Sequence, residues 1–489
     1  MTIMGNYERL LETYKKSTIL ESIAEVLQWD QEVMMPEGAL PVRAQQSSAL
    51  AALEHDILTS DEMNVQLVSV EQENLDLDQA ANVREIKRNF ERARKVPNAL
   101  VQELRETAIT GVESWKAARK GNDFKIFLPS LRNVFALSRK VAEWIDPDKH
   151  PYEVLLESYE QDMSIEEIKS HLNTIKEHFV PLIAGIKGQE IDDSLITREV
   201  DVEKQIEFNR FIAKAIGYDF SKGRLDVSEH PFTSCYGRIT TRYNTGWWSA
   251  ISGTIHEAGH GMYEHHLPLK SFGLPLGQYC SMSVHESQSR LWENNVGKSK
   301  PFWKKFFPDL RNSYGFDVDL EEFYRIINKA EPNFIRIEAD ELTYNLHIIL
   351  RFEIELGLIE GKIHFDELPE VWNQKFKEYL GIVPPADSLG VLQDIHWAWG
   401  NIGYFPTYTL GSMIAAQLFA AAENDIPGLA GSIEQGKFEE LRSWLNRNIW
   451  SHGKRYLTRE LIRRATGKDP APDDYIDYLK SKYSEIYTL

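Results

Sequence analysis

Apolar residues recur at intervals of three and four along most of this chain, with charged residues between them. That spacing puts the apolar side chains on one face of an α-helix. It predicts helices over residues 7–29, 42–56, 124–145, 164–187 and 202–216, the last ending at Gly217, a residue type favoured just after a helix. The charged segment 61–120 is typical of solvated helix faces, because its acids and bases are interleaved.

The alternating pattern of a half-buried strand is sparse, and we expect β structure only in a short region near residues 223–245. Within it, Ile239 to Tyr243 is β-branched and aromatic. The edge of such a small sheet could hold an extended peptide by strand addition. The predicted fold class is therefore mostly α, as one large domain over residues 1–489. It has an N-terminal helical part of about 1–200 and a site-bearing part of about 201–489.

The composition limits which binding partners and which cellular compartment we expect. The net charge is −19, which argues against nucleic acid or an anionic membrane as the main partner. Two cysteines, Cys235 and Cys280, form no disulfide framework and fit a reducing compartment. The segment from Met1 to Lys16 has no apolar core of a signal peptide, and the apolar-leaning segment 408–422 is interrupted by polar residues. We expect a cytoplasmic protein without membrane spans.

The candidate chemistry centres on the pattern H-E-x-x-H, formed by His256, Glu257 and His260. Two histidines four residues apart lie on one helix face, where their rings can occupy adjacent corners of a tetrahedral Zn²⁺. Glu257 is rotated by about 100° from His256, which lets it act as a general base toward the attacking water. The pattern also arises by chance, but its flanks are apolar at helical spacing. Buried histidines there need partners, which favours a metal site over core histidines that are merely hydrogen-bonded.

A catalytic zinc takes three protein ligands and one open position, so a third ligand is required. His266 stands where some zinc peptidases carry their third histidine, but the glycine that turns the chain in those enzymes is Tyr263 here. In an uninterrupted helix His266 points about 240° away from His260, and we reject it. A glutamate from the next helix is the alternative. Spacing modestly favours Glu286 over Glu293, which we interpret as a surface or paired carboxylate.

Several motifs together resemble the carboxypeptidase Taq family of metallocarboxypeptidases over nearly the whole length. They are Trp29-Asp-Gln-Glu with Met35-Pro36 and Arg43-Ala44, His230-Pro-Phe232, the H-E-x-x-H, His285-Glu-Ser287, Ile335-Arg-Ile-Glu-Ala-Asp340 and Gly390-Val-Leu-Gln-Asp-Ile-His-Trp397. The resemblance implies a helical fold with a deep central groove, a homodimer, and removal of single residues from free peptide C-termini. It also implies Glu286 as the third zinc ligand.

One motif departs from the family pattern. The family has D-x-R-x-T just before the zinc helix, whereas this chain reads Tyr236-Gly-Arg-Ile-Thr240 after a shorter loop. Arg238 and Thr240 keep their places, and Tyr236 stands where the aspartate is expected. We expect the change to affect how Arg238 is oriented, and through it substrate length preference or rate. It leaves the zinc ligands untouched.

Two downstream segments carry further candidates. A helix predicted over 335–354 would put Arg336 and Asp340 on one face, either as a salt bridge or with Arg336 gripping the terminal carboxylate of a substrate. An exopeptidase needs such a cation, and with the motif match we favour that role, with Asp340 in support. The second segment, 393–411, is rich in aromatic and glycine residues, as a cleft wall is.

In that second segment, His396, Tyr408 or Tyr404 could donate a hydrogen bond to the oxyanion of the tetrahedral intermediate. Tyr404 is a candidate substrate contact, and Asp394 could orient a ligand histidine. These residues, with zinc held by His256, His260 and Glu286 and with Arg336 and Arg238 as anchors, predict a zinc metallocarboxypeptidase. Co²⁺ is a candidate substitute for Zn²⁺.

Three other functions remain open at this point. The first is a zinc oligopeptidase that cleaves internal bonds on the same scaffold. The second is a catalytically impaired homologue that binds peptides, which the Tyr236 departure suggests. The third is a helical scaffold whose H-E-x-x-H is accidental and binds no metal.

Overall fold

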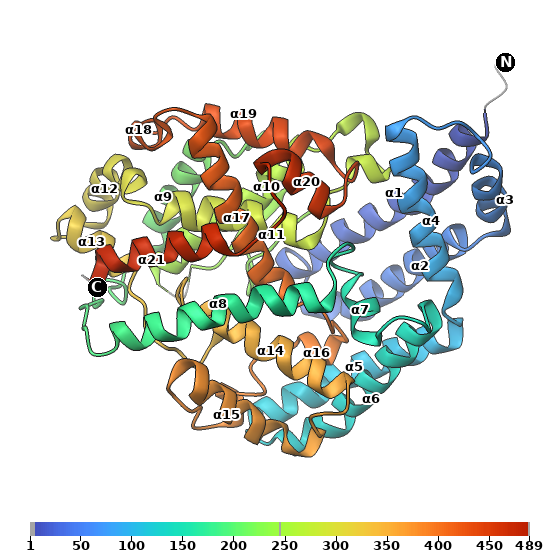
Figure 1. The fold of residues 1–489 in the computed structure, drawn as a ribbon, viewed down its shortest axis with the longest axis horizontal. Helices are drawn as coiled ribbons and strands as arrows, with labels where there is room; N and C mark the ends of the chain where they lie inside the picture. Colours follow the sequence, from blue (N-terminus) through green and yellow to red (C-terminus); the bar gives the residue numbers. More distant parts are fainter. Residues whose placement is uncertain (1–4, 244–245, 488–489) are drawn as a thin grey trace. The chain divides into compact units, whose positions relative to one another are not determined.

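Helices make up most of the chain in a computed structural model that describes residues 5–243 and 246–487 (Figure 1). The chain forms two compact units, each built from three separate stretches. The first unit comprises the residues up to Arg94, Asp192–Ile327 and Leu418–Asp469. The second comprises Lys95–Ile191, Asn328–Gln417 and the residues from Pro470 onward. The mostly α fold class is confirmed, while the division at about residue 200 stays a prediction.

The first unit begins with a pair of long helices, α1 (Asn6–Val33) and α2 (Leu40–Leu58), that pack along each other. Apolar side chains of α1 pack with those of the helices over 61–70 and 77–95 into one buried cluster: Leu10, Tyr14, Met63, Leu67, Val70, Val83, Ile86 and Phe90. The other helices of this unit are α3 (Asp61–Val70), α4 (Leu77–Lys95), α9 (Val202–Ile216), α10 (Trp247–His266), α11 (Met282–Arg290), α12 (Lys300–Tyr314), α13 (Leu320–Ile327), α18 (Leu429–Glu434), α19 (Glu439–Asn448) and α20 (Thr458–Thr466).

The small sheet of the first unit lies in the predicted β region, and residues 244 and 245 of that region are outside the described residues. Its strands are β1 (Leu225–Val227), β2 (Thr233–Ser234) and β3 (Arg238–Thr241), in the order β1-β3-β2. The central strand β3 is parallel to β1 and antiparallel to β2. Because β3 packs against α10, the sheet fixes one side of the helix that carries His256 and His260.

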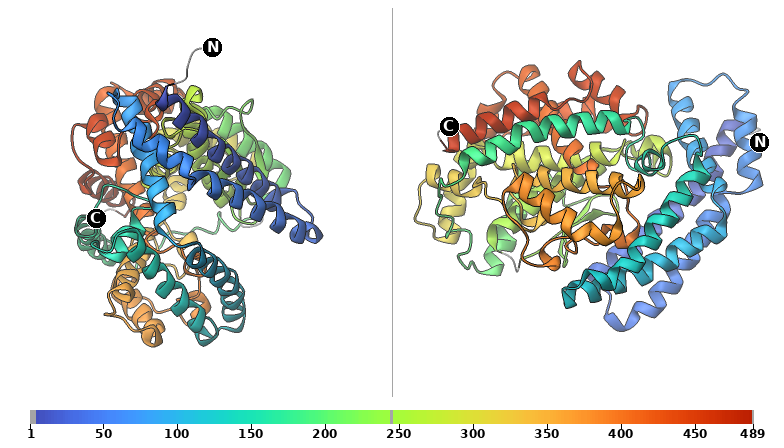
Figure 2. Two further views of the ribbon diagram at one scale, coloured as in Figure 1. Left: turned by 90° about the vertical axis from the view of Figure 1, so that its right-hand side faces the viewer. Right: turned by 60° about the horizontal axis from the view of Figure 1, so that its bottom comes forward.

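The second unit is built around the helices α5 (Asn98–Gly121) and α6 (Phe124–Ile145), which run side by side (Figure 2). Its other helices are α7 (Pro151–Leu156), α8 (Ile165–Ile186), α14 (Tyr344–Ile359), α15 (Leu368–Leu380), α16 (His396–Trp399) and α21 (Asp473–Tyr487). Helix α17 (Pro406–Asp425) begins in this unit. None of the helices in the described part of the chain is long and apolar enough to span a membrane.

Local signals placed several helix ends correctly. Helix α9 ends at Ile216, and Gly217 follows with φ of 110°, a conformation that costs glycine little. One predicted helix is wrong over its first half. Residues 336–338 form a 3₁₀ turn, and α14 starts only at Tyr344, so Arg336 and Asp340 do not share a helix face.

Candidate metal centre

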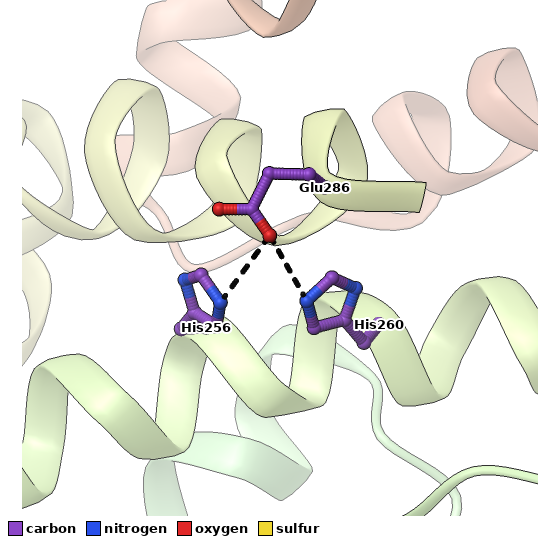
Figure 3. Close-up of side chains that lie close together, drawn as sticks. All are labelled: His256, His260 and Glu286. Atoms are coloured by element: carbon purple, nitrogen blue, oxygen red, sulfur yellow. Dashed lines mark ion pairs between the residues drawn. The ribbon is translucent and has the colours of Figure 1, made fainter. Parts of the chain in front are cut away.

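The H-E-x-x-H residues lie in the middle of α10, the helix expected from the apolar flanks of the motif. Its apolar face is buried through Ile251, Ile255 and Met262. The rings of His256 and His260 project from one side of the helix, one turn apart, with centroids 5.0 Å from each other (Figure 3). Both therefore present a nitrogen to the same space above the helix.

Helix α11 crosses close to α10 at Gly259, and this close approach supplies the third side chain. A Cβ atom at Gly259 would lie 2.7 Å from the carbonyl oxygen of Gln288 and 2.8 Å from the Cα of Ser289. Only a residue without a side chain fits there. The start of α11 is fixed by Ser281, whose hydroxyl accepts a hydrogen bond from the backbone N–H of Val284.

Glu286 descends from α11 toward both histidines (Figure 3). Its Oε2 lies 3.8 Å from Nε2 of His256 and 3.4 Å from Nε2 of His260. Ligand atoms about 2.1 Å from a tetrahedral zinc ion are about 3.4 Å apart, so both distances from Glu286 are close to the spacing of such a site. All candidate ligand atoms of this group lie within 4.8 Å of one another. The donor set of two imidazoles and one carboxylate suits a divalent metal such as Zn²⁺.

The electrostatics leave His260 and Glu286 in metal-binding protonation states. At His256 burial lowers the pKa, but the carboxylates of Glu286 and Glu293 outweigh it and raise that pKa, so a metal there would have to displace a proton. Burial lowers the pKa of His260 to about 3, so its ring is neutral and can offer a lone pair. Burial by itself raises the pKa of Glu286, but Arg290, His256 and His260 together outweigh it and hold that pKa below its ordinary value. The Nε of Arg290 donates to Oε1 of Glu286 at 2.7 Å, which leaves Oε2 directed at the histidines.

Glu293, which the spacing indicated to be a surface or paired carboxylate, is paired and contacts the outer nitrogen of one histidine. The Nδ1 of His256 lies 2.8 Å from Oε2 of Glu293, and Ser252, Arg290 and Lys298 also donate to this carboxylate. Glu293 stands on a π-helical segment, Leu291–Gly297, that continues α11. The signal in the sequence was the seven-residue separation from Glu286, two helical turns, which places both carboxylates on one side of the helix.

Glu257 is buried beside this group and has one side-chain hydrogen-bond partner among the described residues. Its Oε2 accepts a hydrogen bond of 2.6 Å from the hydroxyl of Thr233, in β2. Burial raises the pKa of the Glu257 carboxyl, and His256 and Thr233 partly offset that effect. A carboxylate with a raised pKa next to two candidate ligands has the properties of a general base.

The remaining histidines near the motif have structural contacts. Helix α10 continues through His266, whose Nδ1 lies 2.7 Å from the carbonyl oxygen of Met262 and whose ring packs on Trp450. It is not part of the candidate metal group. The ring of His285 stacks on His260 with centroids 4.3 Å apart, and its Nε2 lies 2.9 Å from Glu264.

The departure at Tyr236 forms a three-residue turn between β2 and β3. Cys235, Tyr236 and Gly237 have φ values of 51°, 60° and 87°, a left-handed conformation that a bulky side chain rarely adopts. Just after the turn, the Arg238 guanidinium lies 4.6 Å from the ring centroid of Trp29. A cation–π contact therefore orients Arg238 here, and its predicted role in binding substrate stays a prediction.

In the second unit, the predicted anchor Arg336 is buried in a cluster of opposite and like charges. Its Nε and Nη2 donate to Oδ1 of Asp394 at 3.0 and 2.7 Å, and Nη1 donates to Tyr344. Arg351 pairs with the other oxygen of Asp394. Two guanidinium groups thus share one carboxylate, which leaves a surplus of positive charge suited to an anion.

The other predicted residues of this unit lie around that cluster or in a turn nearby. The Nε2 of His396 lies 3.3 Å from the Tyr408 hydroxyl, and the ring centroids of His396 and Tyr404 are 5.5 Å apart. Burial lowers the pKa of His396 to about 4, so its ring is neutral. Asp340 accepts hydrogen bonds from Thr343 and from the backbone of Glu331, so it stabilises the turn before α14 and does not pair with Arg336.

A buried helix that presents two histidines and a glutamate, met by a second glutamate from the next helix, defines a metal-dependent peptidase. Comparisons with known proteins agree with this class. The carboxypeptidase Taq (M32) metallopeptidase family matches residues 9–483. Thermostable carboxypeptidase 1 of Thermus thermophilus is 40% identical over 510 residues, covering 100% of both chains. Carboxypeptidase 1 of Bacillus subtilis is 35% identical over 99% of both chains.

Solved structures show the same fold. The crystal structure of the M32 carboxypeptidase from Deinococcus radiodurans R1 matches with a TM-score of 0.95 at 35% identity, covering 99% of this chain and 100% of that chain. The chain belongs to the carboxypeptidase Taq (M32) metallopeptidase family. It is a metallocarboxypeptidase, an exopeptidase that acts on peptides with the help of a metal ion.

Proposed function

We propose that this protein is a zinc-dependent carboxypeptidase that removes single residues from free peptide C-termini, with Glu257 as its general base. His256, His260 and Glu286 would hold the ion. The observation that carries the proposal is the 3.4 and 3.8 Å spacing of their ligand atoms next to a buried carboxylate. A Zn²⁺ ion there would polarise the scissile carbonyl and acidify a water molecule, and Co²⁺ should replace it.

Glu257 carries the proton in this mechanism. Its carboxylate accepts a proton from the water that attacks the last peptide carbonyl and then donates that proton to the leaving amine. The raised pKa of the buried carboxyl makes its carboxylate a stronger base in the first step, and the acid formed there supplies the proton of the second step. No covalent intermediate is needed, so Cys235 and Cys280 take no part.

Arg336 would bind the free carboxylate of the substrate. A guanidinium has five N–H donors, of which Asp394 and Tyr344 occupy three here. The two left over, one each on Nη1 and Nη2, suit a bidentate carboxylate. Arg351 on the other side of Asp394 adds positive charge, and Arg238 and Tyr404 would add contacts to the peptide.

His396 and Tyr408 are the proposed donors to the oxyanion. Since the His396 ring is neutral, one of its nitrogens carries a proton that it can share in a hydrogen bond. Asp394 lies 3.9 Å from Nδ1 of His396 and would hold the ring in place, while Asp340 would support Arg336 through the turn that follows it.

The test joins metal analysis to the release of free amino acids from an unblocked peptide. Glu257→Gln should lower turnover by about 10²- to 10⁴-fold, the usual contribution of a general base, while zinc content stays that of the wild type. Normal turnover by this variant would refute the mechanism. Blocking the peptide with a C-terminal amide should stop the reaction, since Arg336 then lacks its anion. Cleavage of the blocked peptide would favour the oligopeptidase alternative.

We further propose a homodimer in the cytoplasm. The dimer rests on the family relationship, and the lack of a disulfide at Cys235 and Cys280 in the described part of the chain fits a reducing compartment. Sedimentation equilibrium should give about twice the chain mass of 56.4 kDa.

A further inference from the structure

The side chain of Thr233 is the one polar group that contacts the carboxylate of Glu257 in the described part of the chain. Thr233 is the first residue of β2, and its Oγ1 lies 2.6 Å from Oε2 of Glu257 and 3.1 Å from the carbonyl oxygen of the same residue. The other carboxylate oxygen, Oε1, has no hydrogen bond among the described residues. The two oxygens of this buried carboxylate are therefore unequal.

The backbone around Thr233 holds its hydroxyl in place. Thr233 pairs with Ile239 of the central strand, and the backbone N–H and C=O of Phe232 are both bonded to Thr240. Since β3 packs on α10, the strand that carries Thr233 is fixed to the helix that carries Glu257. A hydroxyl on so constrained a backbone can fix the orientation of a carboxylate.

We propose that Thr233 is a positioning residue for the general base: it holds Oε2 of Glu257, so that Oε1 is the atom that receives and returns the proton. The inference rests on the proposed function, because it assumes that Glu257 carries the proton. Without Thr233 the carboxylate could turn about its last torsion, a soft rotation, and Oε1 would spend less time in the reactive position.

The carbonyl oxygen of Glu257 is a second acceptor near the Thr233 hydroxyl, so the O–H can change its hydrogen-bond partner during the reaction. While Glu257 is ionised, the O–H donates to Oε2 in a charge-assisted bond. Once Oε1 has taken a proton, Oε2 is a weaker acceptor, and the O–H can rotate toward the carbonyl oxygen of Glu257. The proton moves from water to Oε1 and then to the leaving nitrogen, and Thr233 keeps its own proton throughout.

A purely structural role for this contact is the competing explanation. The carbonyl of Glu257 lies inside α10, where it already accepts the helical hydrogen bond four residues on. It does not need Thr233 as a partner. The carboxylate does, because a buried charged oxygen without a donor is costly.

The experiment compares Thr233→Val, Thr233→Ser and a matched control, Thr241→Val. Thr241 is a buried threonine of β3 whose hydroxyl donates to a backbone carbonyl of α10, that of Ala250, and not to Glu257. We expect Thr233→Val to lower kcat about 10- to 100-fold, the effect of a misplaced reacting group. KM, bound zinc and the thermal midpoint should match the Thr241→Val control. Thr233→Ser, which keeps the hydroxyl, should recover kcat to within about threefold of wild type.

Three results would overturn the role of Thr233. One is an unchanged kcat in Thr233→Val; another is an equal loss in Thr233→Val and Thr233→Ser; the third is loss of zinc in step with activity. In each of these cases the proposed function still holds if the wild type is active and the Glu257→Gln substitution inactivates it. If the wild type binds zinc but releases no amino acid, the proposed function is wrong, and the role of Thr233, which depends on it, is wrong too.

Discussion

The two histidines of α10 are held by different means. The outer nitrogen of His256 is bonded to Glu293, whereas Nδ1 of His260 is buried and has no hydrogen-bond partner within the described residues. His260 is instead held by stacking on His285. A carboxylate on Nδ1 fixes the tautomer that leaves the lone pair on Nε2 and makes that nitrogen a better donor. We therefore expect the tautomer and ring orientation of His256 to be more firmly fixed than those of His260.

Replacing Glu293 should weaken metal binding without removing a ligand. We expect Glu293→Gln to lower zinc affinity about 10- to 100-fold, because the neutral amide polarises His256 less. Competition with a chromogenic chelator measures the change. Glu353→Gln is the matched control, since Glu353 is a carboxylate of the second unit that pairs with Lys176 and Lys375. Equal affinities for both variants would show that Glu293 does not orient the ligand.

A buried acid in the second unit should make stability depend on pH. Burial raises the pKa of Glu355 to about 7, although Trp397, Tyr152 and the backbone of Gly403 donate hydrogen bonds to it. The folded protein thus keeps a proton that the unfolded chain loses above about pH 4.5. The contribution of this proton to the free energy of unfolding is complete below about pH 4.5 and is lost as pH rises through about 7.

The corresponding test follows unfolding by denaturant from pH 5 to 8 in wild type and Glu355→Gln. Wild type should lose up to about 3 kcal/mol more than the variant over this window. The difference isolates Glu355 from the other titrating groups. Parallel pH curves would contradict the raised pKa.

At the scale of elements, the site depends on how closely α10 and α11 approach. Gly259 leaves no room for a Cβ against α11, and a Cβ atom at Gly261, two residues on, would lie 2.8 Å from the ring of Tyr218. Glycine lowers helix propensity by about 1 kcal/mol relative to alanine, so two of them in one helix turn need a packing reason. The close crossing at Gly259 and the contact with Tyr218 at Gly261 supply it.

Adding one methyl group at Gly259 should push the two helices apart. We expect Gly259→Ala to lower zinc affinity at least about tenfold and to destabilise the fold by about 1–3 kcal/mol, the usual cost of overpacking. Gly253 in the same helix is the control, because its nearest neighbour to an added Cβ is 4.0 Å away. Gly253→Ala should be neutral or stabilising by up to about 1 kcal/mol. Equal effects of Gly259→Ala and Gly253→Ala would contradict the inference that the close approach of α10 and α11 at Gly259 determines zinc affinity.

The first part of the helix predicted over 335–354 does not form, and the reason is local. Asp340 accepts hydrogen bonds from the N–H groups of Leu342 and Thr343 and so caps a turn in place of continuing a helix. The apolar spacing of this segment predicted the helix correctly only from Tyr344 onward. As a result Arg336 meets Asp394, fifty-eight residues away, instead of its neighbour in sequence.

At the scale of the whole molecule, the chemistry is divided between the two units. The candidate ligands and Glu257 belong to the first, and Arg336, Asp394 and His396 belong to the second. Each set lies within one stretch of the sequence, Asp192–Ile327 for the first and Asn328–Gln417 for the second.

Removing the metal should destabilise the protein as well as inactivate it. An ion that binds only the folded chain adds stability, about 2.7 kcal/mol when it is present at 100 times its Kd. We expect a chelator to lower the thermal midpoint and to stop amino acid release, and Zn²⁺ or Co²⁺ to restore both. Differential scanning calorimetry with and without chelator measures the shift. An unchanged midpoint in protein shown to be metal-free would contradict a site that links α10 to α11.

The sequence by itself determined the helical class, the ends of helices such as α9, and the face on which His256 and His260 stand. These features depend on residues within a few turns of one another, where spacing and caps act directly. Only the tertiary structure decided that Glu293 and Thr233 contact His256 and Glu257, and that Arg336 pairs with Asp394. Those contacts join segments far apart in sequence, and they follow from close packing of backbones, as at Gly259, that no local pattern specifies.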